Sequence, residues 1–455
     1  MMREELQCAV PPAFFMPHPK AAKTENLSFR MENMNHILNI TAADVEPRLL
    51  DLPWNLPLRE WPDDVIIALP RGISRHVVRF ANLNGKTVAV KEISEDLARH
   101  EYSTLRSLYR LSGSCVEPVA IVNNRFTADG QPLNAALVTR HLPFSLPYRA
   151  VFGQSGMRGE TVNRLMDALS VLIVRLHLIG FYWGDISLSN TLFRRDAGEY
   201  AAYLVDAETG ELFPHISDGK REYDVETAHL NIIGELMDLQ AGGILMQEYD
   251  AIEIGNRFLD RYHKLWDELT GEESFSINDK WRVDQRIQRL NELGFDVAEL
   301  KMTADINGTT MSIRPRVVDA GHYSRRLMRL TGLDVEEAQA RRMINDMKQY
   351  RVLSGNQDTN LAIVAHEWMQ NVYEPTIRAI PRELRGKLEP AQIFHEVLEH
   401  RWYISEKAGH DVSMQEAIDS YINQILKNRP DEAALLGQSV GEKPEPDEDW
   451  SGYLA

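Results

Sequence analysis

Apolar β-branched residues and polar residues are interleaved between about residues 64 and 141, in the segments DVIIALPRG, HVVRFANLNGKTVAVKEI and LNAALVTRHL. This pattern predicts strands, and the dipeptide Asn84-Gly85 predicts a hairpin turn between two of them. One segment departs from it, because SEDLARHEYSTLRSLYRL places Leu97, Leu105 and Leu108 on one face of a helix. The sequence therefore predicts a strand-rich region that a single helix interrupts.

Helical periodicity replaces this pattern from about residue 158 to residue 270, with a short hairpin predicted near residues 191 to 205. A further hairpin, turned at Asn307-Gly308, opens a second region that continues as helices. The strand-rich and helical parts together predict an α+β protein. We expect four parts: an irregular N-terminal strap at 1–60, a first domain at 61–272, a mostly helical C-terminal domain at 273–436 and an acidic disordered tail at 437–455. The strap ends in DLPWNLPLREWP, whose tryptophans and prolines predict an ordered segment packed on a domain.

The composition excludes several classes of function. The chain has 455 residues, of which 44% are hydrophobic and 26% charged, as in a globular protein of two or three domains. Its formal net charge of −17 opposes binding to a phosphate backbone, so we expect no nucleic-acid partner. We expect a cytoplasmic protein without a membrane span, because no apolar stretch matches a bilayer and the start does not resemble a signal peptide. Cys8 and Cys115 are the only cysteines, which excludes a disulfide framework.

The segment GFYWGDISLSNTLF places several polar side chains among large apolar ones, where a folded protein must satisfy or use them. Asp185 and Asn190 lie five residues apart, and the predicted hairpin then leads to Asp206 in the segment DAETGE. This is the order of parts in a kinase active site, where one aspartate accepts a hydroxyl proton while an asparagine and a second aspartate hold the metal. The spacing therefore predicts Asp185 as the catalytic residue, and Asn190 and Asp206 as ligands of Mg²⁺.

The same hypothesis requires a lysine on a preceding strand and an acidic partner for it. The segment VAVK matches the kinase pattern V-A-I-K, which predicts that Lys91 binds phosphates of ATP. Glu101 lies on the apolar stripe of the predicted helix, four residues after Leu97, and a carboxylate there requires a buried cation. We therefore expect Glu101 to pair with Lys91, across a gap of ten residues that is short for a eukaryotic-type protein kinase.

The segment LPRGISRHVV, between the first two predicted strands, is the candidate for a turn that covers the nucleotide phosphates. It contains one glycine, Gly72, in place of the G-x-G-x-x-G pattern of protein kinases. Side chains such as Ser74 and Arg75 can supply contacts that the backbone of the missing glycines would otherwise make. Gly72, Ser74 and Arg75 are therefore predicted to bind ATP together with Lys91 and Glu101.

Beyond these spacings, several longer segments resemble a known family. They are DLPWNLPLREWPDD, LPRGISRHVVRF, FSLPYR, GFYWGDISLSNTLFRRDAGEYAAYLVDAETGEL and KLEPAQIFHEVLEHRWYISEKAG. Between about residues 40 and 435 the chain looks like bacterial proteins in which a lipopolysaccharide-kinase-like domain, of the Kdo or heptose kinase type, precedes a C-terminal domain of unknown function. The resemblance implies a protein-kinase-like bilobal fold, with a β-rich N-lobe and a helical C-lobe, and the use of ATP; it implies no particular acceptor.

Departures from the protein-kinase pattern bear on the acceptor. Trp183 stands where histidine is expected, Ser187 where Ser/Thr protein kinases have lysine, and Ala-Glu follows Asp206 in place of Phe-Gly. Asp224 leads a predicted helix that is expected to brace the catalytic loop. The segment between Asp206 and Asp224 is short and lacks an A-P-E sequence. These features favour an ATP- and Mg²⁺-dependent phosphotransferase with a non-protein acceptor. Two alternatives stay open: a nucleotide-binding pseudokinase that acts as a regulatory scaffold, and nucleotidyl transfer to a protein.

The second region contains IRPRVVDAGHYSRRLMRLTG, a concentration of cations in an acidic chain. One interpretation is an electrostatic seam against the acidic first domain, or an exposed charged helix. The other is that Arg325 and Arg326 receive an anionic or carbohydrate-like small molecule as the acceptor, because an arginine fork suits such anions.

Overall fold

The computed structural model describes residues 37–44, 46–67, 75–83, 85–153, 159–276, 279, 281–304 and 310–432. The predicted tail at 437–455, residues 1–36 of the predicted strap, and the turn residues Asn84, Asn307 and Gly308 lie outside these ranges. Of the part described, no helix combines the length and apolar character needed to cross a membrane.

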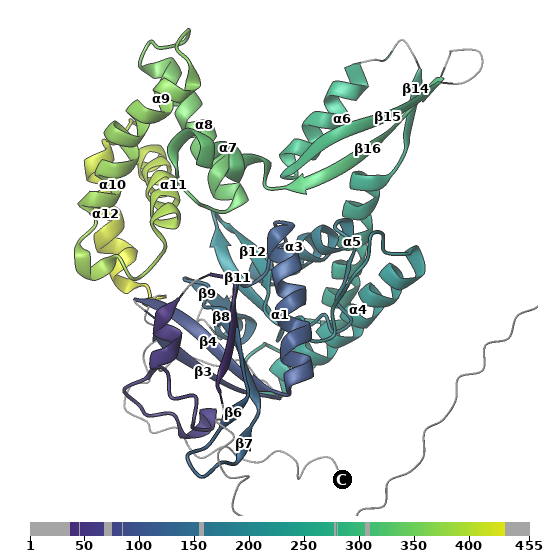
Figure 1. Cartoon of the computed structure of the whole chain (residues 1–455). Coiled ribbons are helices and arrows are strands. Elements are labelled where there is room, and N and C mark those ends of the chain that lie inside the picture. The colour runs from purple at the N-terminus through teal and green to yellow at the C-terminus, as the bar shows by residue number, and fades with distance from the viewer. Residues whose placement is uncertain are drawn as a thin grey trace, which may run out of the picture. The chain divides into compact units, whose positions relative to one another are not determined.

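A six-stranded antiparallel sheet forms the N-terminal part (Figure 1). Its strands are β1 (Asn39–Ala42), β2 (Ile66–Ile67), β3 (Val77–Leu83), β4 (Lys86–Ile93), β5 (Pro118–Asn123) and β8 (Ala135–Arg140), in the order β1-β5-β8-β4-β3-β2. The predicted helix is α1 (Glu95–Arg110), which follows β4 and packs against β5 and β8. The short strands β6 (Arg125–Phe126) and β7 (Pro132–Leu133) pair with each other.

The two faces of the sheet belong to different cores, because successive side chains of a strand point to opposite faces. On β8, Leu137 packs with α1 and the following helices, whereas Val138 packs with Trp54 and Trp61. The tryptophans lie in the segment that carries the short helices η1 (Pro47–Asp51) and η2 (Leu58–Glu60). Residues 46–61 are therefore an ordered strap packed on the sheet, as their tryptophans and prolines predicted.

A helical part follows and forms the largest core. Its helices are α2 (Tyr148–Phe152), α3 (Gly159–Leu178), α4 (Asp218–Ala241) and α5 (Ala251–Thr270). Its strands are β9 (Ser145–Pro147), β10 (Phe181–Tyr182), β11 (Thr191–Asp196), β12 (Glu199–Leu204) and β13 (Glu211–Leu212). The predicted hairpin is β11–β12, and β9 pairs with its first strand.

The C-terminal part opens with a three-stranded sheet, which has one strand more than the predicted hairpin, and continues as helices, as the sequence predicted. Its sheet consists of β14 (Glu273–Ser276), β15 (Phe295–Ala304) and β16 (Thr310–Ala320), with α6 (Trp281–Glu292) before β15. The helices that follow are α7 (His322–Thr331), α8 (Glu337–Leu353), α9 (Leu361–Trp368), the π-turn η4 (Met369–Tyr373), α10 (Glu374–Ala379), η5 (Arg382–Leu384), α11 (Pro390–Ala408), α12 (Met414–Gln424) and η6 (Leu426–Asn428). The α+β class is confirmed: a β-rich part, a helical part and a mostly helical C-terminal region.

Candidate active site

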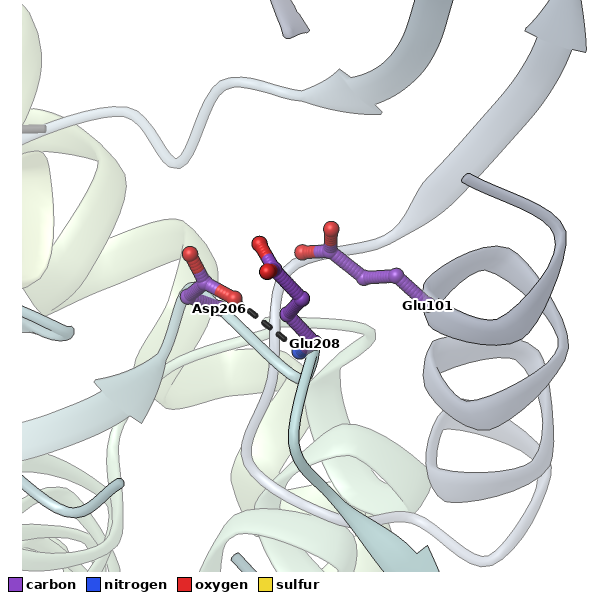
Figure 2. A group of neighbouring side chains, drawn as sticks. All are labelled: Glu101, Asp206 and Glu208. Carbon is purple, nitrogen blue, oxygen red and sulfur yellow. Dashed lines mark hydrogen bonds between the residues drawn. The ribbon is translucent and has the colours of Figure 1, made fainter. Parts of the chain in front are cut away.

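Lys91 is the centre of a charged cluster built from three separate segments. Its Nζ donates to Glu101 Oε2 at 3.0 Å and to Asp206 Oδ2 at 2.7 Å, and it lies 3.4 Å from Glu208 Oε2. Figure 2 shows that Glu101 comes from α1, whereas Asp206 and Glu208 come from the segment after β12. The lysine side chain is 12% exposed and that of Glu101 only 1%, so water screens this contact weakly. The ion pair expected between Lys91 and Glu101 is therefore present.

The cluster changes the protonation of its members. Burial lowers the pKa of Lys91, but the charges of Glu101 and Asp206 outweigh it, so the pKa of Lys91 is raised above 10.5. Burial and the charge of Asp206 raise the pKa of Glu101 to about 7, against the opposing effect of Lys91. Lys91 is therefore a permanent cation near neutral pH, while Glu101 is a carboxyl group that titrates there.

Asp185 and Asn190 meet in the loop between β10 and β11. The amide nitrogen of Asn190 donates to the Asp185 carbonyl at 3.0 Å and to Asp185 Oδ2 at 3.2 Å. Because the amide nitrogen is used in this way, the side-chain oxygen of Asn190 is left to accept or to coordinate. The side chain of Asp185 is 40% exposed, so its carboxylate can be reached from solvent.

One face of α4 holds this loop in place. Asp224 is fully buried and accepts hydrogen bonds from the backbone N–H groups of Trp183 and Gly184, each at 2.8 Å. Seven and eleven residues later, the Asn231 amide donates to the Ile186 carbonyl at 3.0 Å, and Glu235 accepts from the Leu188 N–H at 2.6 Å. These spacings return to the same face of a helix. The brace expected from Asp224 is therefore present.

Glu235 is a loop-bracing residue that the sequence analysis did not identify. It also accepts from the backbone N–H of Ser189 at 2.9 Å and from the hydroxyl group of Ser189. Burial raises the pKa of Glu235, although its hydrogen bonds to Ser189 and Leu188 oppose the shift. The spacing of 7 and 11 residues after Asp224 on one helix was the signal that could have identified Asn231 and Glu235.

Trp183 connects the loop of Asp185 with the segment of Asp206. Its buried indole Nε1 donates to the Asp206 carbonyl at 2.8 Å, and the Thr209 hydroxyl donates back to the Trp183 carbonyl at 2.7 Å. The tryptophan that replaces the expected histidine therefore fixes the two acidic segments relative to each other. Ser187, in the position of the expected lysine, is buried and accepts from the Asn190 N–H at 3.2 Å, so it shapes the loop.

Carboxylate oxygens gather where a divalent cation can bind. Oxygen atoms of Glu101, Asp206 and Glu208 all lie within 4.8 Å of one another (Figure 2). Hard cations such as Mg²⁺ prefer oxygen ligands of this kind. Glu208 also lies 2.9 Å from His76 Nε2, and it occupies the position where protein kinases have glycine. The sequence analysis noted Glu208 as a departure from the pattern but did not assign it to the site.

The predicted phosphate-covering turn is described only in part. Gly72 and Ser74 lie outside the described residues, whereas Arg75 places its Nη2 3.7 Å from Asp185 Oδ2. The Arg75 side chain is 75% exposed, so the pair is worth little to stability and the cation is accessible. Arg325 and Arg326 line two separate cavities, and neither lining contains Asp185, Asn190 or Asp206.

C-terminal helices hold the hairpin β11–β12, which runs from Asn190 to Asp206. Asp196, at the end of β11, accepts from the N–H groups of Ala338 and Gln339 at 3.0 and 2.7 Å, which caps the first turn of α8. The side chain of Gln392 on α11 accepts from the Ala197 N–H at 3.0 Å. The C-terminal part therefore contacts the chain segment that joins the two predicted metal ligands.

Comparisons with known proteins give one family match and a set of matches among solved structures. Residues 264–426, less than half of the chain, match a family model described as a domain of unknown function (DUF4032). This match lies in the region where the sequence resemblance implied a C-terminal domain of unknown function. Nothing among curated proteins matches the chain. Among solved structures, WaaP in complex with acyl carrier protein is similar over 56% of this chain and 99% of that chain, with 14% sequence identity and a TM-score of 0.33.

Proposed function

We propose that the protein is a kinase-like phosphotransferase that moves the γ-phosphoryl group of ATP to a hydroxyl group of a non-protein acceptor. The observation that supports this proposal is the convergence of Lys91, Glu101 and Asp206 in one hydrogen-bonded cluster, joined through Trp183 to the loop of Asp185 and Asn190. These groups come from β4, α1, the loop between β10 and β11, and the segment after β12. Kinase chemistry needs these types of residue in this order.

The proposed roles follow from the chemistry of each group. Lys91, steadied by Glu101, binds phosphate oxygens of the nucleotide, because a buried permanent cation stabilises their charge. Asp206 and the side-chain oxygen of Asn190 hold Mg²⁺, which neutralises charge on the phosphates when it is bound. The oxygen of the acceptor hydroxyl bonds to the γ-phosphorus, and Asp185 takes the proton from that hydroxyl group. The bond from that phosphorus to the bridging oxygen breaks, and ADP leaves with the electron pair.

The short segment that follows Asp206 favours a small acceptor. Between Asp206 and the start of α4 at Asp218 there is one short strand, β13, which leaves little chain for docking a peptide. Arg75 lies beside Asp185 and exposes its guanidinium group. An exposed arginine in this position suits an acceptor that carries phosphate or carboxylate groups, such as an anionic carbohydrate.

The test is transfer of label from ATP to the small-molecule fraction of a cell extract. With γ-labelled ATP and Mg²⁺, the wild-type protein should label an acceptor, and Asp185→Asn should lower turnover by at least about a hundredfold while ATP affinity changes only a few fold. Asp218→Asn is the matched control, since it makes the same chemical change at a side chain that is 94% exposed. It should retain full turnover.

Two outcomes would contradict the proposal and favour the alternatives. ATP binding with no transfer to any fraction would indicate a nucleotide-binding pseudokinase. Labelling of protein by α-labelled ATP, but not by γ-labelled ATP, would indicate nucleotidyl transfer.

A further inference from the structure

A cavity of about 540 Å³ lies apart from the candidate active site. It is lined by α3, α5 and β12 on one side and by the segment from α7 to the start of α8 on the other. None of Lys91, Asp185, Asn190 and Asp206 lines it. Its volume falls within the range of about 300 to 1,000 Å³ that is typical of small-molecule sites.

Carboxylates line this cavity, but most of them are directed at partners in its wall. Asp167 pairs with Arg261 at 3.1 Å, and Glu199 pairs with Arg341 at 3.5 Å. Glu337 accepts from the backbone N–H groups at the start of α7, at 2.7 and 2.9 Å, as Asp196 does at the start of α8. Glu336 also lines the cavity, where it accepts from the Tyr203 hydroxyl at 2.6 Å and pairs with Arg194 at 2.8 Å. The two remaining lining carboxylates, those of Glu292 and Asp334, belong to exposed residues. Most carboxylates of the wall are therefore compensated by an arginine or by backbone N–H groups, and the others belong to solvent-exposed residues.

Arg175 on α3 differs from the other lining arginines in its surroundings. Its Nε is buried and has no hydrogen-bond partner, and its Nη1 makes only a long contact of 3.5 Å to the Ser114 hydroxyl. Among the described side chains, no carboxylate lies within 4.0 Å of its guanidinium group, which stacks 5.7 Å from the ring of Phe295. Arginine stays charged at any physiological pH, so this cation lines a cavity without a counter-ion.

We propose that this cavity binds a small organic anion, carrying phosphate or carboxylate, and that Arg175 anchors its charged group. The guanidinium fork can donate two hydrogen bonds to the oxygens of a planar carboxylate or of a tetrahedral phosphate. Tyr200 and Tyr323 also line the cavity and provide aromatic surface for the organic part of the ligand. The proposal does not depend on phosphotransfer, since no residue of that site takes part.

The test uses calorimetric titration of the full chain in magnesium-free buffer, with pyrophosphate and citrate as the two probes. Binding of pyrophosphate alone would identify a phosphate site, and binding of citrate alone a carboxylate site. Arg175→Gln should weaken binding of the active probe at least tenfold, because it removes a charge-assisted hydrogen-bond donor. Ala201→Phe, which extends a side chain from β12 into the cavity, should weaken it similarly without removing a charge.

Two variants decide whether the probe occupies this cavity. Arg401→Gln is the matched control, because Arg401 pairs with Asp411 on the surface and does not line the cavity. Lys91→Gln tests the candidate active site, and neither variant should change affinity more than twofold. The proposal is overturned if no probe binds at millimolar concentration, if Arg175→Gln and Ala201→Phe bind as the wild type does, or if Lys91→Gln alone removes binding.

Discussion

Arg194→Met should loosen the attachment of the C-terminal helices to the hairpin β11–β12. The guanidinium group lies 2.8 Å from Glu336 and 2.5 Å from Glu389, and the three side chains are 15%, 10% and 14% exposed. Burial lowers the pKa of Arg194, but these two carboxylates reverse the shift and raise it. Burial also raises the pKa of Glu389, an effect that Arg194 opposes. Removing the arginine therefore leaves two largely buried carboxylates without their common cation.

The expected size of the effect follows from this burial. Removing one partner of a buried ion pair typically costs about 3–5 kcal/mol, because the remaining charge is left uncompensated. The triple variant Arg194→Met, Glu336→Gln, Glu389→Gln removes both charges as well, so it should lie within about 2 kcal/mol of the wild type. Arg48→Met is the matched control, because its pair with Asp51 is 3.9 Å long and exposed and is worth less than about 1 kcal/mol.

Urea unfolding followed by circular dichroism would measure these differences. The C-terminal part has cores of its own, so the transition need not be two-state. In Arg194→Met we expect a transition at a lower urea concentration than in the wild type, in which the C-terminal helices become sensitive to protease. Equal losses of stability in Arg194→Met and Arg48→Met would refute the reasoning from burial, as would a triple variant no more stable than the single one.

Three further predictions concern the site and its supports. Asp224→Asn should lower the free energy of unfolding by about 3 kcal/mol, since the N–H groups of Trp183 and Gly184 are accepted by different carboxylate oxygens and an amide replaces one of these with an NH2 donor, and it should slow turnover; a melting temperature no lower than that of the exposed control Glu226→Gln would contradict this. Burial and the charge of Glu336 raise the pKa of Asp196 from 3.8 to about 7, so the folded protein retains a proton that the unfolded chain loses between about pH 4 and pH 7. The melting temperature of the wild type relative to Asp196→Asn should therefore fall as pH rises through this window, whereas parallel curves would show no such linkage. Mg²⁺ with ATP should raise the melting temperature, and Asp206→Ala should remove the part of the shift that needs metal; an unchanged wild-type melting curve would argue against nucleotide binding of either kind.

Short-range patterns in the sequence were enough to predict one contact of the candidate site and to place two of its residues in one loop. Lys91 and Glu101 lie on the consecutive elements β4 and α1. The apolar stripe of α1 places Glu101 on the face of the helix that packs against the core. Asp185 and Asn190 lie in one loop, and five residues allow the asparagine amide to reach back to the aspartate. The predicted pair of Lys91 and Glu101 is confirmed, whereas the hydrogen bond between Asn190 and Asp185 was not predicted, although it too needs little beyond local geometry. The chemical roles of these residues remain predictions.

Two contacts between segments that are distant in the sequence were not predicted. Glu208 lies 117 residues after Lys91, and its sequence context is only that of an acidic residue in a turn. Ala338 lies 142 residues after Asp196, so no spacing indicates that an aspartate at the end of one strand caps a helix of the C-terminal part. Such pairs depend on how whole elements pack, and a polar residue at the surface of one element has no periodicity that identifies its partner.

The sequence by itself determined the α+β class and the succession of a strand-rich part, a helical part and a mostly helical C-terminal part, because propensity and periodicity act within a few residues. The roles that loop spacing assigns to Lys91, Asp185, Asn190 and Asp206 remain predictions. Only the tertiary structure decided that Glu208 joins the cluster around Lys91, that α4 presents three side chains to the loop of Asp185, and that Arg175 lines a cavity with no counter-ion among the described residues. In each of these cases the electrostatic environment comes from burial among groups far apart in the chain, and burial exists only once the chain is folded.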